Sequence, residues 1–168
     1  MGLRTVRLLV PVAVALCFSV GCAGRGARPL PFPQPSPPLG PSPQTSPRAA
    51  AVVETALGLQ GVPYRPGGTD PAGFDCSGLV AYVLARHGVL LPRTVAEQFT
   101  VGRKVHPAAI QAGDLVFFRT SGRGASHVGI AVTPEAFVHA PSSAGTVRVE
   151  QLWAPYWSRR FLGARRLP

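Results

Sequence analysis

The sequence predicts a single α+β domain in which N-terminal helices pack on an antiparallel β-sheet. Apolar residues recur at helical spacing in the first half of the domain, between residues 46 and 101. From residue 114 onward, short segments rich in Val, Ile and Phe are separated by Gly, Pro and Ser, which is the pattern of strands joined by turns. Helices followed by a run of strands are the element order of α+β domains.

Three helices are expected, over residues 46–60, 76–86 and 94–101. Ser46 followed by Pro47 provides an N-cap and a first-turn proline for the first helix. Gly88 stops the second helix. Thr94 and Glu97 have the spacing of a capping box at the start of the third.

Five strands are expected to follow, over residues 114–119, 127–132, 136–140, 146–152 and 160–166. If the second and third strands form a hairpin whose loop is residues 133–135, Gly129 faces His139 across the pair. His127 then lies on the same face as His139, diagonal to it and within reach of its ring. A two-residue loop would shift the register by one and place the two histidines on opposite faces.

Residues 1–22 are expected to be a signal peptide. Arg4 and Arg7 precede an apolar run over residues 8–20, which is shorter than the about 20 apolar residues that a spanning helix needs. The letters SVGC at 19–22 look like a lipoprotein processing site, which would make Cys22 the lipidated N-terminus. Ordinary cleavage after Ala23 is the alternative. The protein is therefore expected to be an exported lipoprotein that is anchored to a membrane and faces the periplasm or the cell wall.

Residues 23–48 are expected to form a Pro-rich tether ahead of a folded domain at 49–168. Nine prolines fall between residues 25 and 48, so this segment cannot build a packed core. An extended polyproline conformation would give it a reach of up to roughly 70 Å. Behind a lipidated cysteine, such a tether lets the domain act some way from its membrane.

Charge restricts the class of partner only loosely. Seventeen Lys and Arg against seven Asp and Glu give a formal net charge of +10, which suits anionic polymers, lipid headgroups or nucleic acid. The sequence has no helix-turn-helix, zinc-finger or RNA-binding signature, so no nucleic-acid partner is predicted. With so few acids, a hydrolase built on paired carboxylates is also disfavoured.

Cys76 is the single free thiol that export would leave in the mature domain. It begins the helix expected at 76–86, on the same apolar face as Leu79 and Val83. Unpaired N–H groups and the positive end of the helix dipole are expected to stabilise a thiolate there and to lower its pKa. The same N–H groups can receive the oxyanion of a tetrahedral intermediate. A buried structural cysteine is the alternative interpretation.

A thiolate nucleophile needs a histidine partner, and the four histidines are not equivalent. His87 at a helix end and His106 before a proline are expected to be solvated or to cap local backbone. His127 and His139 are the candidates, because they fall on neighbouring strands. His139 would fix the tautomer of His127 and leave the second ring nitrogen of His127 for the thiol.

The motifs DCSGL at 75–79, SHVGI at 126–130 and FVHA at 137–140 resemble those of the NlpC/P60 cell-wall cysteine peptidases. Further collinear pieces agree: VPY at 62–64, GG at 67–68, LPRT at 91–94, GDLVFF at 113–118, YW at 156–157 and RF at 160–161. The resemblance covers residues 49–167 and therefore implies that residues 49–168 form a catalytic domain.

The resemblance implies a papain-like α+β fold and a Cys–His–His triad, with Cys76 as nucleophile, His127 as general base and acid, and His139 as the orienting member. It also implies cleavage of peptidoglycan stem peptides, typically between D-glutamate and the following diamino acid. No metal or cofactor is predicted, and the protein is expected to act as a monomer.

Tyr64, Asp75 and Ser77 match positions that line the substrate site in such enzymes. Asp75 has a second interpretation as a helix cap, and Tyr64 as a packing residue. Asp114 is interpreted as a turn or network residue and is left out of the site. Arg65 departs from the family pattern, in which an aromatic residue often follows the tyrosine.

Three alternatives remain open at this point. An amidase or acyltransferase would use the same thiol on the same scaffold. A non-catalytic wall-binding lipoprotein would keep the fold without the reaction, although such a protein has no need of a free thiol outside the cell. A zinc site would use the three ligands Cys76, His127 and His139, but the resemblance to a cysteine peptidase argues against it.

Overall fold

The computed structural model describes Gly2 and residues 46–168. The predicted signal peptide, Cys22 and nearly all of the predicted tether therefore lie outside the described residues. Among the helices of residues 46–168, none has the length and apolar character that crossing a membrane requires. Pro47 and Arg48, which fall within the range predicted for the tether, form the first turn of the first helix.

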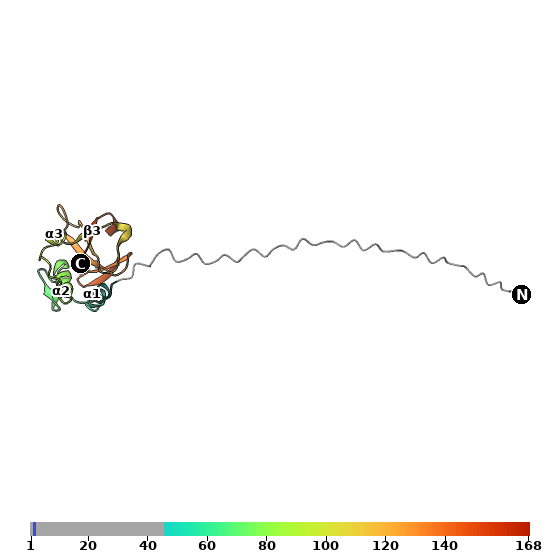
Figure 1. Cartoon of the computed structure of the whole chain (residues 1–168), viewed down its shortest axis with the longest axis horizontal. Coiled ribbons are helices and arrows are strands. Elements are labelled where there is room, and N and C mark those ends of the chain that lie inside the picture. Colours follow the sequence, from blue (N-terminus) through green and yellow to red (C-terminus); the bar gives the residue numbers. More distant parts are fainter. Residues whose placement is uncertain (1, 3–45) are drawn as a thin grey trace. The chain divides into compact units, whose positions relative to one another are not determined.

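Helices come first and most strands follow, so the predicted α+β class is confirmed (Figure 1). The elements are α1 (Pro47–Leu57), β1 (Thr69–Asp70), β2 (Gly73–Phe74), α2 (Cys76–Ala85), α3 (Val95–Gln98), β3 (Arg103–Val105), the 3-10 helix η1 (Pro107–Ala109), β4 (Leu115–Phe118), β5 (His127–Ala131), β6 (Ala136–His139), β7 (Arg148–Gln151), α4 (Pro155–Ser158) and β8 (Phe161–Arg166).

The three predicted helices begin where their caps place them. Ser46 caps α1 with its side chain, and Thr94 and Glu97 form the predicted capping box of α3. Helices α1 and α3 both end three residues before their predicted ends. The chain leaves each helix through turns that lead to a glycine with positive φ, Gly61 after α1 and Gly102 after α3.

Six strands form one antiparallel sheet in the order β3-β8-β4-β5-β6-β7, and it contains all five predicted strands. The sixth strand, β3, is not predicted, because its residues Arg103 and Lys104 interrupt any apolar run. Both side chains are exposed. Charged side chains on an edge strand discourage pairing with other chains. The two-residue strands β1 and β2 pair with each other in a separate small sheet.

The sheet has a different covering on each face. Helices α1 and α2 pack on one face, where Leu79 and Val83 of α2 join Val128 of β5 in the larger buried cluster. The other face carries a second cluster that contains Phe118 and Trp157. Because α2 packs directly against β5, the helix and this strand are held together.

Strands β5 and β6 pair in the register predicted for the three-residue loop. Ile130 faces Val138, and by the same register Gly129 lies opposite His139. The prediction that His127 and His139 share one face of the sheet is therefore confirmed. The face that they share is the one that carries the second cluster, since His127 is the cross-strand partner of Phe118.

Gly129 lets β5 and β6 approach closely at this point. A Cβ on Gly129 would lie 2.6 Å from the Phe137 ring, 2.7 Å from the Val138 carbonyl oxygen and 3.1 Å from the Cβ of His139. Distances this short are collisions, so a side chain here would push β6 and its histidine away from β5.

We expect Gly129→Ala to lower the free energy of unfolding by about 1–3 kcal/mol, the usual effect of overpacking a buried site. Urea unfolding measures the change. Gly58→Ala is the matched control, because Gly58 has a φ of −64° and a Cβ there would lie 3.5 Å from its nearest neighbours. The control should unfold at the wild-type urea concentration or slightly above it. Equal midpoints for Gly129→Ala and the wild type would contradict the close approach.

Candidate active site

Helix α2 presents Cys76 at its first position. The side chain of Asp75 caps this helix by accepting a hydrogen bond from the Gly78 N–H at 2.7 Å. A Cβ on Gly78 would lie 2.0 Å from the carbonyl oxygen of Gly68, so the glycine allows the preceding loop to pack tightly on the first turn. The cap and this close contact together fix where the helix starts and hence where the thiol lies.

The Cys76 thiol is half-buried and is not part of a disulfide. Burial raises its pKa, and the negative charge of Asp75 raises it further. Hydrogen bonds from the backbone amides of Val128, Ser77 and Cys76 itself lower the pKa but do not compensate. The prediction that the helix start lowers this pKa is therefore wrong, because burial and the capping carboxylate outweigh the amides. The thiol is protonated at neutral pH.

His127 on β5 and His139 on β6 are hydrogen-bonded to each other, with 2.7 Å between His127 Nε2 and His139 Nδ1. His127 is buried and His139 is fully buried. Burial lowers the pKa of His127 to about 4. Burial, together with the charges of His127 and Arg148, also lowers the pKa of His139. Both rings are therefore neutral at pH 7, and Nδ1 is the nitrogen of His127 that this bond leaves free.

Strand β5, which carries His127, contacts the Cys76 thiol through its backbone. The Val128 amide, which faces the Cys76 sulfur, belongs to the residue that follows His127 on β5. Cys76 and His127 therefore come from two elements that meet at one backbone amide. The arrangement brings a protonated thiol to the strand of a buried, neutral imidazole that is hydrogen-bonded to a second imidazole.

Trp157 of α4 and Glu150 of β7 complete the surroundings of the two rings. The Trp157 ring stacks on His127 at a centroid distance of 5.4 Å and meets His139 edge-on at 5.0 Å. Its Nε1–H donates to Glu150 Oε2. The same carboxylate oxygen lies 3.9 Å from His139 Nε2, and the other oxygen pairs with Arg148 Nε at 3.1 Å.

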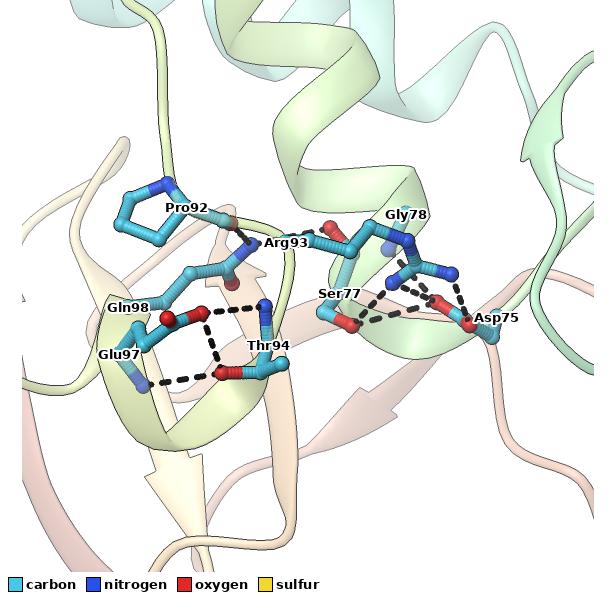
Figure 2. Close-up of polar contacts among 8 residues, drawn as sticks. All are labelled: Asp75, Ser77, Gly78, Pro92, Arg93, Thr94, Glu97 and Gln98. Atoms are coloured by element: carbon cyan, nitrogen blue, oxygen red, sulfur yellow. Dashed lines mark hydrogen bonds and ion pairs between the residues drawn. The ribbon is translucent and has the colours of Figure 1, made fainter.

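Asp75, Ser77 and Arg93 form a polar cluster at the start of α2 (Figure 2). Arg93 donates to the Ser77 hydroxyl at 2.8 Å and to both carboxylate oxygens of Asp75. Burial raises the pKa of Asp75, but these bonds, the cap and the charge of Arg93 outweigh it and hold the pKa below its usual value. Gln98 supports the cluster by donating to the carbonyl oxygens of Ser77 and Pro92. The interpretation of Asp75 as a helix cap is confirmed.

Tyr64 also lies close to the thiol. It is half-buried and forms a β-bridge with Phe74, just before α2. Burial raises the pKa of its hydroxyl, and the ionised form of Cys76 and the Asp75 carboxylate raise it further. The structure thus places Tyr64, Asp75 and Ser77 beside the thiol, and the two histidines on the strand pair next to it. Cys22 lies outside the described residues.

The other two histidines lie outside this cluster; His106 caps local backbone as predicted, whereas His87 is half-buried and bonds to a side chain of α1 and not to local backbone. His87 Nε2 lies 2.8 Å from the Thr55 hydroxyl, and His106 caps η1 through its ring. Asp114 is a network residue as predicted, since it is buried and pairs with Arg166 at 2.6 Å. Within residues 46–168, no group of three or more His, Cys, Asp or Glu side chains is placed to hold a metal ion.

Sequence reasoning assigns no role to Arg93, Trp157 or Glu150. The first two lie in the motifs LPRT and YW, so a signal for them exists in the sequence. Glu150 is found only through strand pairing: in β7 it faces Phe137 of β6, which brings it to the face of the sheet that carries His139. That register cannot be read from the 146–152 segment by itself.

Comparison with known proteins identifies the family of this domain. The profile of the NlpC/P60 family matches residues 61–166. The chain is 41% identical over 114 residues to murein DD-endopeptidase MepH of Escherichia coli K12, which covers 64% of this chain and 41% of that protein. It is 43% identical over 118 residues to gamma-DL-glutamyl hydrolase of Bacillus subtilis 168, covering 68% of this chain and 28% of that protein.

A solved structure has the same fold. An NlpC/P60 family protein from Bacillus cereus ATCC 10987 superposes with a TM-score of 0.66 at 32% identity, over 70% of this chain and 39% of that one. The chain thus spans less than half the length of these three proteins. The matched segment 61–166 contains the thiol, both paired histidines and every strand of the sheet, and on this basis the chain belongs to the NlpC/P60 family.

Proposed function

We propose that this protein is a peptidoglycan endopeptidase that cuts stem peptides by a cysteine mechanism. The observation that carries the proposal is the meeting of the Cys76 thiol with the strand that bears His127, whose ring is bonded to His139. Two relatives bear the names murein DD-endopeptidase and gamma-DL-glutamyl hydrolase, which supports cell-wall peptides as the substrate class.

In the proposed reaction, Cys76 Sγ attacks the scissile carbonyl carbon while Nδ1 of His127 takes the thiol proton. The pKa of the thiol is raised and that of His127 is lowered, so this proton moves during the attack and not before it. Backbone amides at the start of α2 receive the oxyanion. His127 then gives its proton to the leaving amine, and the acyl-enzyme thioester is hydrolysed by a water that His127 deprotonates.

The bond that we propose joins D-glutamate to the following diamino acid, which the relative named gamma-DL-glutamyl hydrolase supports. A DD bond is the second candidate, supported by the relative named murein DD-endopeptidase. Mass spectrometry of defined muropeptides after digestion separates the two, because the first cut leaves an N-terminal diamino acid and the second does not. Uncut stem peptides would refute the peptidase proposal and favour an amidase, an acyltransferase or a wall-binding role.

We expect Cys76→Ala and Cys76→Ser to abolish muropeptide cleavage, because the nucleophile is lost or weakened. His127→Asn should lower the rate by about 10²–10⁴-fold, the usual contribution of a general acid–base group. His139→Asn should cost less, because His139 acts through His127. Initial rates measure the effects, thermal unfolding checks the fold, and His87→Asn is the matched control with a wild-type rate. Activity in Cys76→Ala would contradict the assignment.

The pH dependence should reveal the buried state of His127. Protonated His127 cannot accept the thiol proton, so the acid limb of kcat/KM should lie near pH 4, the lowered pKa, and not near 6.5. In the unfolded chain His127 regains its ordinary pKa and binds a proton more readily than in the folded chain. The free energy of unfolding should therefore decrease as the pH falls from about 6.5 to about 4.

A pH–rate profile and urea unfolding at several pH values measure these two effects. His127→Asn is the control for stability, since it removes this part of the pH dependence. An acid limb at pH 6.5 would show that His127 titrates as an exposed histidine and would contradict the proposed state of the base.

We also propose that the chain is exported and is held by lipid on Cys22, facing the periplasm or the cell wall. The apolar run at 8–20 and the letters SVGC at 19–22 support this. Cys22→Ser should move the protein from the detergent phase to the aqueous phase in a detergent partition assay. Identical partition of the variant and the wild type would refute lipidation at this residue.

A further inference from the structure

The proposed triad gives no role to Nε2 of His139, although this atom is polar and buried. His139 is fully buried, and its Nε2 has no hydrogen-bond partner among the described residues. Buried polar groups in folded proteins are nearly always paired. The carboxylate that faces this atom is that of Glu150, whose Oε2 lies 3.9 Å from Nε2.

We propose that Glu150 is a positioning residue that fixes the proton arrangement of the histidine pair. A carboxylate only accepts hydrogen bonds, so Glu150 favours the tautomer of His139 that carries its proton on Nε2. His139 Nδ1 is then an acceptor, and His127 Nε2 must donate to it across 2.7 Å. Nδ1 of His127 is left unprotonated, which is the state that a base for the Cys76 thiol requires. The inference rests on the proposed cysteine mechanism.

The Glu150 side chain is held for this role from two sides. Trp157 donates its Nε1–H to Oε2, and Arg148 pairs with Oε1 at 3.1 Å. The distance from Oε2 to His139 exceeds a hydrogen bond by about 1 Å. At this distance the carboxylate acts on the Nε2–H of His139 through its negative charge and not through a hydrogen bond.

The carboxylate also affects the charged state of the pair. When His127 takes the thiol proton, the bond to His139 transmits part of the positive charge towards Glu150, which stabilises it. Arg148 has the opposite effect, since its charge lowers the pKa of His139 and it is the cross-strand partner of that residue. The charged groups that shift the pKa of His139 are His127 of β5 and Arg148 of β7, and the carboxylate that faces its Nε2 is that of Glu150 of β7.

Glu150→Gln is the test, because the amide oxygen can still accept from Trp157 while the negative charge is lost. We expect kcat to fall about tenfold or more with KM unchanged, as for groups that orient a histidine from behind. Nitrogen-15 NMR of the histidine rings in the full chain should show His127 Nδ1 becoming partly protonated. Glu150→Asp should restore part of kcat. Glu54→Gln, an exposed glutamate in α1, is the matched control and should behave as the wild type.

Wild-type kcat and unchanged ring-nitrogen shifts in Glu150→Gln would overturn the proposal. A rise in KM alone would overturn it too, since that marks a substrate contact. A loss of kcat that follows a lower melting temperature, with no change of tautomer, would make Glu150 only structural. The NMR measurement needs no turnover, so if the wild type cleaves no muropeptide the proposed function fails while the tautomer still decides the role of Glu150.

Discussion

The hydrogen-bonded pairing of β5 with β6 is the constraint on which the site depends. It places His127 and His139 on one face of the sheet, and Gly129 permits the close approach in which His127 Nε2 lies 2.7 Å from His139 Nδ1. Packing of α2 against β5 then brings the thiol to the Val128 amide, one residue from His127. A shift of one residue in this pairing would remove the second imidazole and leave the thiol with an isolated histidine.

The parts of the fold that local chemistry determines could be predicted from the sequence. Ser46, Asp75 and Thr94 cap their helices because side-chain oxygens reach backbone amides within one turn. The sequence limited the hairpin to two registers, one for a three-residue and one for a two-residue loop, and the structure shows the first. Strand β3 could not be predicted, because its partner β8 lies about sixty residues further along the chain and its own residues carry no apolar pattern.

The chemistry of the site could be predicted less completely than its geometry. The positions of Cys76, His127 and His139 follow from motifs and spacing, but the pKa of the thiol depends on its surroundings. Burial and the Asp75 carboxylate act against the helix amides, and only the folded structure shows which effect is larger. The position of Glu150 near His139 could not be predicted for a similar reason. Strand pairing, and not proximity in the sequence, brings the two residues together.

The raised pKa of Cys76 has a consequence for survival outside the cytoplasm. The thiolate is the form of cysteine that reacts with disulfides and peroxides, whereas the protonated thiol reacts slowly. A protein exported as proposed works outside the reducing cytoplasm. Because Cys76 stays protonated and half-buried until a base takes its proton, the same environment that delays attack also preserves the nucleophile between substrates.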